Sequence, residues 1–182
     1  MQCTCFGLVF GRADDPPDCL EDENGEFVTE IGFYHLLATP LERALPRLLE
    51  RALAGGYRIV VRAASPERIE HLNAVLWTYD EASFLPHGAS RDGNAASQPI
   101  WLTDGIENPN EATMLVLVDG VDAQDQAAFA RCADLFDGND EAAVAAARER
   151  WRRAAAAGHT LTYWQQTEAG WQKKPAAAHP SD

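Results

Sequence analysis

The stretch EIGFYHLLATPLERALPRLLERALAGGYRIVVRA, Glu30 to Ala63, decides the fold class. β-formers and apolar residues dominate 30–37 and are followed by a turn signal, which predicts a strand. Apolar residues then recur at three- and four-residue spacing from Leu41 to Leu53 and stop at a glycine pair. This pattern predicts an amphipathic helix, despite Pro46 inside it. The β-branched run at 57–63 predicts a second strand.

The same alternation of strands and helices continues along the chain. The further predicted elements are a helix from Pro66 capped by Ser65, strands in PIWLT and ATMLVLVDG, a helix running into a short strand over 122–136, an Ala-rich helix that ends at Gly158, and a final β-rich edge over 159–166. Strands and helices that alternate at this spacing predict an α/β, Rossmann-like fold. We expect a mostly parallel sheet with helices on both faces.

Composition limits where the chain works and what it binds. With a formal net charge of −13, the chain is a poor candidate for direct, sequence-independent binding to duplex DNA, so we expect any contact with DNA to be indirect. No apolar run approaches the roughly 20 residues that cross a bilayer. The first residues also lack the basic start and long apolar stretch of a secretory signal. We therefore expect a cytoplasmic protein without membrane contact.

The chain divides into three predicted parts. Residues 1–28 carry seven acidic residues against one basic residue and several turn signals, which predicts a disordered acidic extension. Residues 29–166 hold the α/β domain, and 167–182 are predicted to be a flexible tail. An alternative explanation of the extension is a start assigned too far upstream, because a GTG codon at Val28 would be an alternative initiator.

The motifs of the common α/β enzymes are absent from the sequence. The turn after the first strand, ATPLERA, has no glycine, and neither a G-x-G-x-x-G nor a P-loop pattern occurs, so we expect no nucleotide cofactor. Scattered histidines and an isolated CTC predict no metal site. Cys132 lies in a helical pattern and is interpreted as a small buried hydrophobic residue. A pairing of His87 with Asp119 at the strand ends is the remaining route to an active site.

The segment ARERWRRAAAAGHTLTYW, 147–164, carries the clearest binding signal. On a helix, Arg148, Trp151 and Arg152 stand at i, i+3 and i+4, so two guanidinium groups flank one indole on the same face. Six basic residues against two acidic ones over 148–174 give a local charge of +4. Because arginine binds carboxylates through two hydrogen bonds, this face predicts a site for an acidic peptide that ends in an aromatic residue. The alternative is an ordinary solvated helix face.

A second candidate surface lies in VLWTYDEASFLPHG, 75–88. Its large residues alternate too irregularly for one helix or one strand, so Trp77 and Phe84 are candidates for an exposed docking surface. In the alternative interpretation, Trp77 completes the apolar face of its helix and Phe84 lies in the core.

The segments IGFYHL, LWTYDEASFLPHG, NPNEATMLVLVDG and ARERWRRAAAAGHTLT together resemble the chi subunit of bacterial DNA polymerase III holoenzyme, over about 29–166. The resemblance implies a Rossmann-like fold without nucleotide binding and a non-catalytic accessory role at the clamp loader. It also implies a bridge, through the psi subunit, to the acidic C-terminal tail of single-stranded DNA-binding protein.

The resemblance assigns residues to both surfaces. The carboxylates of the tail would meet Arg148 and Arg152, and its terminal phenyl ring would enter a pocket bounded by Trp151 and Phe136. The opposite surface, which faces psi or a helicase partner, carries over to Trp77 and Phe84. Two other function classes remain as alternatives: a small α/β enzyme acting on a phosphorylated or nucleotide substrate, and an interaction module unconnected with replication.

Overall fold

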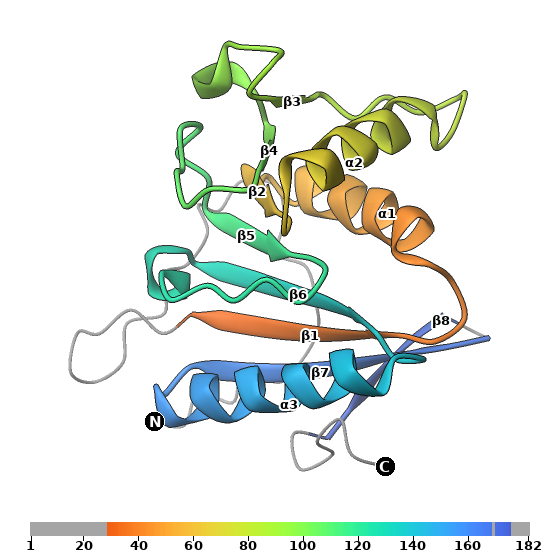
Figure 1. Ribbon diagram of the computed structural model, residues 1–182, viewed down its shortest axis with the longest axis vertical. Coiled ribbons are helices and arrows are strands. Elements are labelled where there is room, and N and C mark those ends of the chain that lie inside the picture. Colours follow the sequence, from red (N-terminus) through yellow and green to blue (C-terminus); the bar gives the residue numbers. More distant parts are fainter. Residues whose placement is uncertain (1–28, 169, 176–182) are drawn as a thin grey trace, which may run out of the picture.

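The sheet of the protein is open and mostly parallel (Figure 1). The computed structural model describes residues 29–168 and 170–175, and within them eight strands run in the order β3-β4-β2-β5-β6-β1-β7-β8. Every neighbouring pair is parallel except β7 and β8, which are antiparallel. The strands are β1 (Glu30–Leu36), β2 (Ile59–Arg62), β3 (His87–Ala89), β4 (Ile100–Thr103), β5 (Met114–Leu117), β6 (Arg131–Asp137), β7 (Thr160–Thr167) and β8 (Gly170–Lys174).

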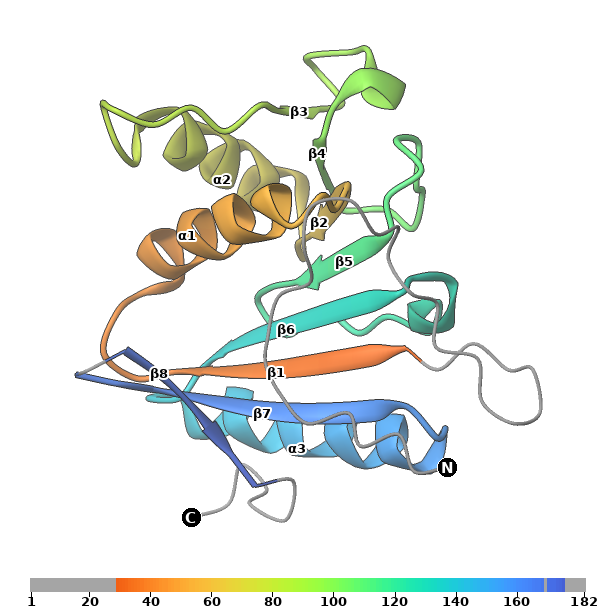
Figure 2. The same cartoon turned by 180° about the vertical axis from the view of Figure 1, so that it is seen from behind.

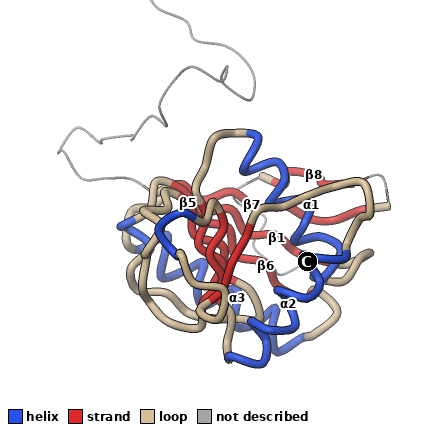
Figure 3. Tube along the Cα trace, turned by 90° about the horizontal axis from the view of Figure 1, so that it is seen from above, coloured by secondary structure: helices blue, strands red, loops and turns tan. Residues whose placement is uncertain are grey.

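Short buried strands form the middle of the sheet. Each residue of β2 and β5 is buried, as expected for strands covered on both faces, which read as continuous apolar runs rather than as alternating patterns. The view from above shows the strands crossing the domain with helices around them (Figure 3).

Three α-helices cover the sheet in the described part of the chain: α1 (Leu41–Ala54), α2 (Pro66–Thr78) and α3 (Glu141–Ala156). Ser65 caps α2 by accepting a hydrogen bond from the backbone N–H of Arg68, and Asp140 caps α3 by accepting one from Ala142. Single turns of 3-10 helix occur at Ala95–Ser97 and Gln126–Ala128.

The helices lie on both faces and produce two cores. Leu45 and Leu49 of α1 and Leu72 of α2 pack on one face, whereas Ala147 and Trp151 of α3 pack on the other. Figures 1 and 2, taken from opposite sides, show α3 beside β7 and β1 and the pair α1 and α2 beside the other end of the sheet. The predicted fold class is thus confirmed.

Some predicted elements differ from the structure. The helix expected at the start of 122–136 is only the 3-10 turn, and Cys132, placed in that helix, lies on β6. Cys132 was assigned to a helix because β6 gives no clear strand pattern. This strand is central and buried on both faces, so its sequence lacks the two-residue alternation that marks a half-buried strand.

The C-terminal part of the sheet is also larger than predicted. β7 is not the edge, because β8 pairs with it. The residues from Gly170 to Lys174, expected to belong to a flexible tail, form that edge strand. The predictions for residues 1–28 and 176–182 lie outside the described residues. Among the described residues, no helix has the length and apolar character needed to span a membrane.

Candidate functional site

The arginines predicted to bind an acidic peptide lie on α3. Arg152 is exposed and Arg148 is partly buried, and their spacing of four residues puts both on one side of the helix. We call this pair the α3 arginine surface. It lies on the face of the sheet opposite α1 and α2.

Trp151, whose indole was expected to lie between the two guanidinium groups on that face, is buried instead. Its side chain is 4% exposed, and its ring packs against Phe33 with the centroids 5.0 Å apart and edge-on against Tyr163 at 6.3 Å. Ala147, Trp151 and Ala154 recur at four- and three-residue spacing and form the apolar stripe that faces the sheet. In a helix so rich in alanine, the tryptophan supplies most of the apolar area of that stripe, so it turns inward.

The positive charge of the segment is also smaller than the sequence predicted. Arg150 is buried and gives both Nε and Nη2 to the Asp134 carboxylate, at 2.6 and 3.0 Å. Arg152 donates to Glu149, one turn earlier on α3. Arg153 donates to Asp122 at 2.5 Å. Arg150 is therefore a structural group, whereas the Arg152 and Arg153 side chains are exposed and each is paired with one carboxylate.

Below Arg148 lies a group of aromatic and imidazole rings. Phe136, on β6, is 3% exposed and stacks on His35 with the centroids 5.0 Å apart. His35 Nδ1 forms a hydrogen bond with the hydroxyl of Tyr163. Both rings that were predicted to border a pocket, Trp151 and Phe136, are thus part of the core beneath the arginines.

The Arg148 guanidinium is close enough to two of these side chains, His35 and Tyr163, to affect their pKa values. Burial lowers the pKa of His35, the positive charge of Arg148 lowers it further, and the Gly138 carbonyl and Asp137 oppose the shift. Burial raises the pKa of Tyr163, and Arg148 opposes that rise. A carboxylate that binds Arg148 would therefore lie close to a neutral imidazole and a protonated phenol.

Trp77 and Phe84 form the second candidate surface. Their side chains are 57% and 70% exposed, which confirms the predicted exposure, and their ring centroids are 6.1 Å apart. Trp77 also contacts His87, at 5.0 Å between ring centroids, and His87 Nδ1 lies 2.6 Å from the carbonyl oxygen of Leu85. We call Trp77 and Phe84 the aromatic surface.

The loop that carries Phe84 is attached to α1. Glu50 accepts hydrogen bonds from the hydroxyls of Tyr79, at 2.8 Å, and Ser83, at 2.6 Å. The Asp80 carboxylate accepts the backbone N–H of Ala82, which closes the turn. These bonds fix Phe84 beside Trp77, so the aromatic surface is held in place before any partner binds.

The edge of the sheet where related folds hold phosphate is filled by the protein itself. After β1, the backbone N–H groups of Leu37, Ala38 and Thr39 all point at one oxygen, Gln166 Oε1, at 3.2, 2.9 and 2.9 Å. Convergent amides of this kind usually bind an anion. Here a side-chain amide from β7 satisfies all three, so these amides are not available to a phosphate.

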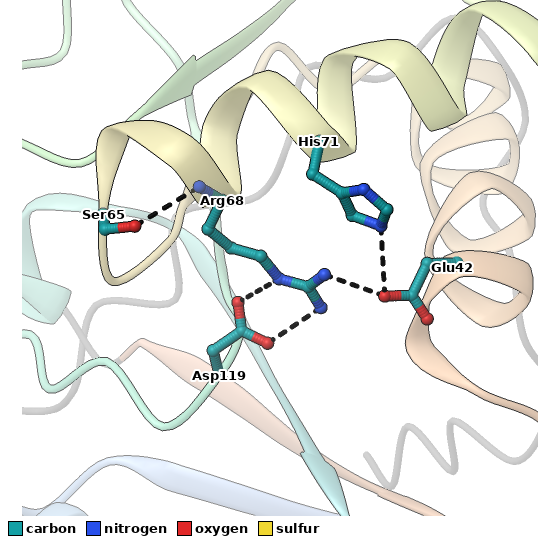
Figure 4. A network of polar contacts seen from close by, with 5 residues as sticks. All are labelled: Glu42, Ser65, Arg68, His71 and Asp119. Carbon is teal, nitrogen blue, oxygen red and sulfur yellow. Dashed lines mark hydrogen bonds and ion pairs between the residues drawn. The ribbon is translucent and has the colours of Figure 1, made fainter.

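An ion-pair network closes the same edge, as Figure 4 shows. Arg68 of α2 gives Nε and Nη2 to Asp119, at 2.7 and 3.0 Å, and Nη1 to Glu42 at 2.8 Å. His71 Nε2 lies 3.7 Å from the Glu42 carboxylate. Asp119 is thus committed to Arg68, and His87 contacts Trp77 at the start of β3, so the structure does not bring the His87 and Asp119 pair together.

A comparison with known families decides the identity. The family model described as DNA polymerase III chi subunit, HolC, matches residues 28–162. The chain belongs to the DNA polymerase III chi subunit family. It is 34% identical over 99 residues to the probable DNA polymerase III subunit chi of Rickettsia prowazekii (strain Madrid E). That alignment covers 54% of this chain and 60% of the relative.

Both candidate surfaces can be placed relative to the family match. The α3 arginine surface and the aromatic surface both lie inside the range that matches the DNA polymerase III chi subunit family. Among the described residues, no cluster of three or more His, Cys, Asp or Glu side chains could hold a metal ion. Cys132 is buried, and burial raises the pKa of its thiol, as expected of an unreactive core residue.

A cavity of about 180 Å³ lies between α2 and the end of β4, and the sequence analysis did not find it. Its walls bring together residues from three separate segments, which is why no local pattern signals it. The only sequence signal nearby is Ile106, an isolated apolar residue between polar neighbours, whose side chain is 82% exposed. The cavity is lined by Pro66, Ile69, Glu70, Asn73, Ala89, Ser90, Arg91, Leu102, Thr103, Asp104 and Glu107.

Proposed function

We propose that this chain is a non-catalytic replication adaptor. Its α3 arginine surface binds the acidic C-terminal tail of single-stranded DNA-binding protein. Its aromatic surface contacts a psi subunit or a helicase and so links the tail to the DNA polymerase III clamp loader or to that helicase. The observation that supports this most strongly is the family match over 28–162, which includes both surfaces.

The chemistry of the α3 arginine surface suits an acidic tail. Guanidinium groups bind carboxylates with charge-assisted hydrogen bonds, and two of them one turn apart can hold a short acidic run. Because Trp151 and Phe136 are buried, these two rings offer almost no exposed area to the terminal phenyl ring of the tail. We therefore expect the carboxylates to contribute more to affinity than the phenyl ring.

The aromatic surface suits a protein partner. Exposed tryptophan and phenylalanine rings held by neighbouring contacts bury large areas without losing much side-chain entropy on binding. The α3 arginine surface lies on α3, and the aromatic surface lies on α2 and the loop that follows it; the two helices pack on opposite faces of the sheet. An adaptor built this way can hold both partners at once.

Calorimetry with a peptide of the tail from the same organism tests the proposal. Arg148→Ala should weaken binding by roughly 1.5–3 kcal/mol, because a charge-assisted contact is lost. The effect of Arg152→Ala should be at the lower end of that range, because its side chain is 64% exposed and already paired with Glu149. Binding should also weaken as salt is added.

Arg153→Ala is the matched control, because it removes an exposed arginine of the same helix that lies outside the surface. A peptide without its last residues is the second control. Unchanged affinity in both Arg148→Ala and Arg152→Ala, or an equal loss in Arg153→Ala, would contradict the assignment.

A further inference from the structure

The strands β1, β7 and β8 have one face that no helix of the described residues covers. In Figure 2 they lie in front of α3, whereas α1 lies over β2 and β6 and α2 lies further along the sheet. Tyr34 on β1 and Trp164 on β7 are directly opposite in the strand register, and their neighbours Phe33 and Tyr163 pack beneath α3. Because successive side chains of a strand point to opposite faces, Tyr34 and Trp164 project from the uncovered face.

Trp171, on the edge strand β8, completes a group of three rings on this face. Its ring meets that of Tyr34 edge-on, with the centroids 5.3 Å apart. The rings of Tyr34 and Trp164 are nearly parallel, with 6° between their planes and 6.3 Å between their centroids. All three side chains are partly exposed, and we call them the open-face rings. Aromatic rings gathered on an exposed sheet face indicate contact with a partner that has planar or apolar groups.

A stripe of arginines runs along α1 on one side of these rings. Arg43, Arg47 and Arg51 recur every four residues, so they lie on one side of the helix, and all three side chains are exposed. No carboxylate of the described residues pairs with any of them. Burial raises the pKa of Tyr34, and the charges of Arg131 and Arg51 oppose that rise, so the stripe ends near the open-face rings.

Positive charge also lies on the other side of the rings, at the edge of the sheet. The Lys173 ammonium, on β8, is 5.9 Å from the centroid of the Trp164 ring. Two carboxylates belong to these strands and their turn. Glu30 pairs with Arg131 at 3.1 Å, and Glu168 lies exposed in the turn between β7 and β8. The arginine stripe and Lys173 therefore leave this region with a local excess of positive charge in a chain whose net charge is −13.

This combination of groups favours one class of partner. A single-stranded nucleic acid presents phosphates to cationic side chains and unpaired bases to aromatic rings, and proteins bind it with both kinds of group together. An acidic peptide would use the arginines and leave the rings without a contact. A duplex keeps its bases stacked inside, so it would also leave the rings without a contact.

We propose that this surface binds a short stretch of single-stranded nucleic acid. The phosphates contact the arginine stripe of α1 and Lys173, and the bases stack on the open-face rings. This goes beyond the adaptor role, in which the protein reaches DNA only through a partner. It also departs from the expectation drawn from net charge, because the positive charge is concentrated locally. The overall negative charge keeps affinity low, with a dissociation constant on the order of 10⁻⁴ M at physiological salt.

The first test is a titration of the full ¹⁵N-labelled chain with oligothymidylate of about 12 nucleotides, followed by NMR. The indole N–H signals of Trp164 and Trp171 should shift saturably, and that of the buried Trp151 on the other face should not. A strand of the same length and charge that lacks its bases should bind at least tenfold more weakly. A polyglutamate peptide of equal charge should compete no better than that strand.

The salt dependence of binding counts the phosphate contacts. For single strands, the slope of log K against log salt is about −0.7 for each neutralised phosphate, so four cations predict about −3. Arg43→Gln with Arg47→Gln should reduce this slope to about half. Arg91→Gln with Arg153→Gln is the matched control, because it removes the same charge from exposed arginines that already pair with carboxylates, and it should bind as the wild type does.

The contribution of the rings is tested at the edge strand. Trp171→Ala should weaken binding of oligothymidylate by about tenfold or more, because a stacking contact is lost. Trp171→Phe keeps a ring in the same place and should restore most of the affinity. The comparison of the base-bearing and base-free strands on the wild-type chain decides the question even where Trp171→Ala folds poorly.

Equal binding of the base-bearing and base-free strands would overturn the inference, as would equal competition by polyglutamate, which would assign the surface to acidic peptides. Equal losses in the two double-arginine variants would also overturn it. None of these results changes the calorimetry with the acidic tail, which depends on α3, so failure here is distinguishable from failure of the proposed function.

Discussion

At the scale of single residues, neighbouring arginines of α3 differ widely in burial, which the sequence pattern does not indicate. Arg150 and Arg152 are two positions apart on α3, yet the side chain of the first is 4% exposed and that of the second 64%. The helix period decides which one faces the sheet, and the position of Asp134 on β6 gives the buried one its partner. The same logic makes Trp151 a core residue and leaves the Arg152 side chain exposed.

The buried pair predicts a large difference between two aspartates. Asp134→Ala should lower the free energy of unfolding by about 3–5 kcal/mol, because it leaves the Arg150 charge buried without compensation. Asp122→Ala removes the partner of Arg153 from an exposed pair and should cost less than about 1 kcal/mol. Urea unfolding of the two variants measures both, and similar losses would show that Arg150 finds another partner or reaches water.

His35 predicts a pH dependence of stability. Burial lowers its pKa in the folded chain, so the unfolded chain, where a histidine titrates near 6.5, binds more protons below that pH. The contribution of neutral His35 to stability should be fully present above about pH 6.5 and be lost as the pH falls toward its folded pKa. Urea unfolding at pH 7.5 and 5.5 should show a smaller pH effect in His35→Asn than in the wild type.

The matched control for that measurement is His71→Asn, because the His71 side chain is 56% exposed. A His35→Asn variant with the same pH dependence as the wild type would show that other groups cause the acid sensitivity.

At the scale of elements, contacts between distant segments occupy the edge of the sheet at which other α/β proteins bind ligands. Gln166 on β7 accepts three backbone N–H bonds from the turn after β1, and Arg68 joins α1, α2 and the segment after β5. The turn after β1 therefore stays ordered with no phosphate bound. This also explains why a turn without glycine is tolerated there.

Gln166→Ala should destabilise the fold by about 1–3 kcal/mol, because three amide donors lose their acceptor. Gln166→Glu keeps an acceptor oxygen in the same place and should cost less. Gln165→Ala, next to it on β7, removes a partly exposed amide and controls for the change of side chain. Thermal unfolding distinguishes the three, and equal losses in Gln166→Ala and Gln165→Ala would contradict this account of the turn.

At the scale of the whole molecule, the sheet separates the two candidate binding surfaces. α3 covers one face and α1 with α2 the other, so the α3 arginine surface and the aromatic surface belong to different sides of the domain (Figures 1 and 2). The fold class is one in which ligands commonly bind at the carboxyl ends of parallel strands. In this chain that edge carries the Gln166 contacts and the Arg68 network instead.

Titration with ATP, GTP and NAD should therefore show no saturable binding at millimolar concentration. Pro40 offers no N–H at the start of α1, and the amides before it are taken by Gln166. Equilibrium dialysis or calorimetry measures this directly. Saturable binding that a substitution within 39–42 abolishes would contradict the account and support the enzyme alternative.

The sequence by itself determined the order of most elements and the mostly parallel sheet with helices on both faces. These follow from apolar periodicity, caps and turn residues, all of which act over a few neighbouring positions. Only the tertiary structure decided that Trp151 is buried, that Gln166 fills the turn after β1, and that a cavity opens beside the aromatic surface. Gln166 and Thr39 are 127 residues apart, and a contact at that separation depends on how the strands are ordered in the sheet, which no local pattern specifies.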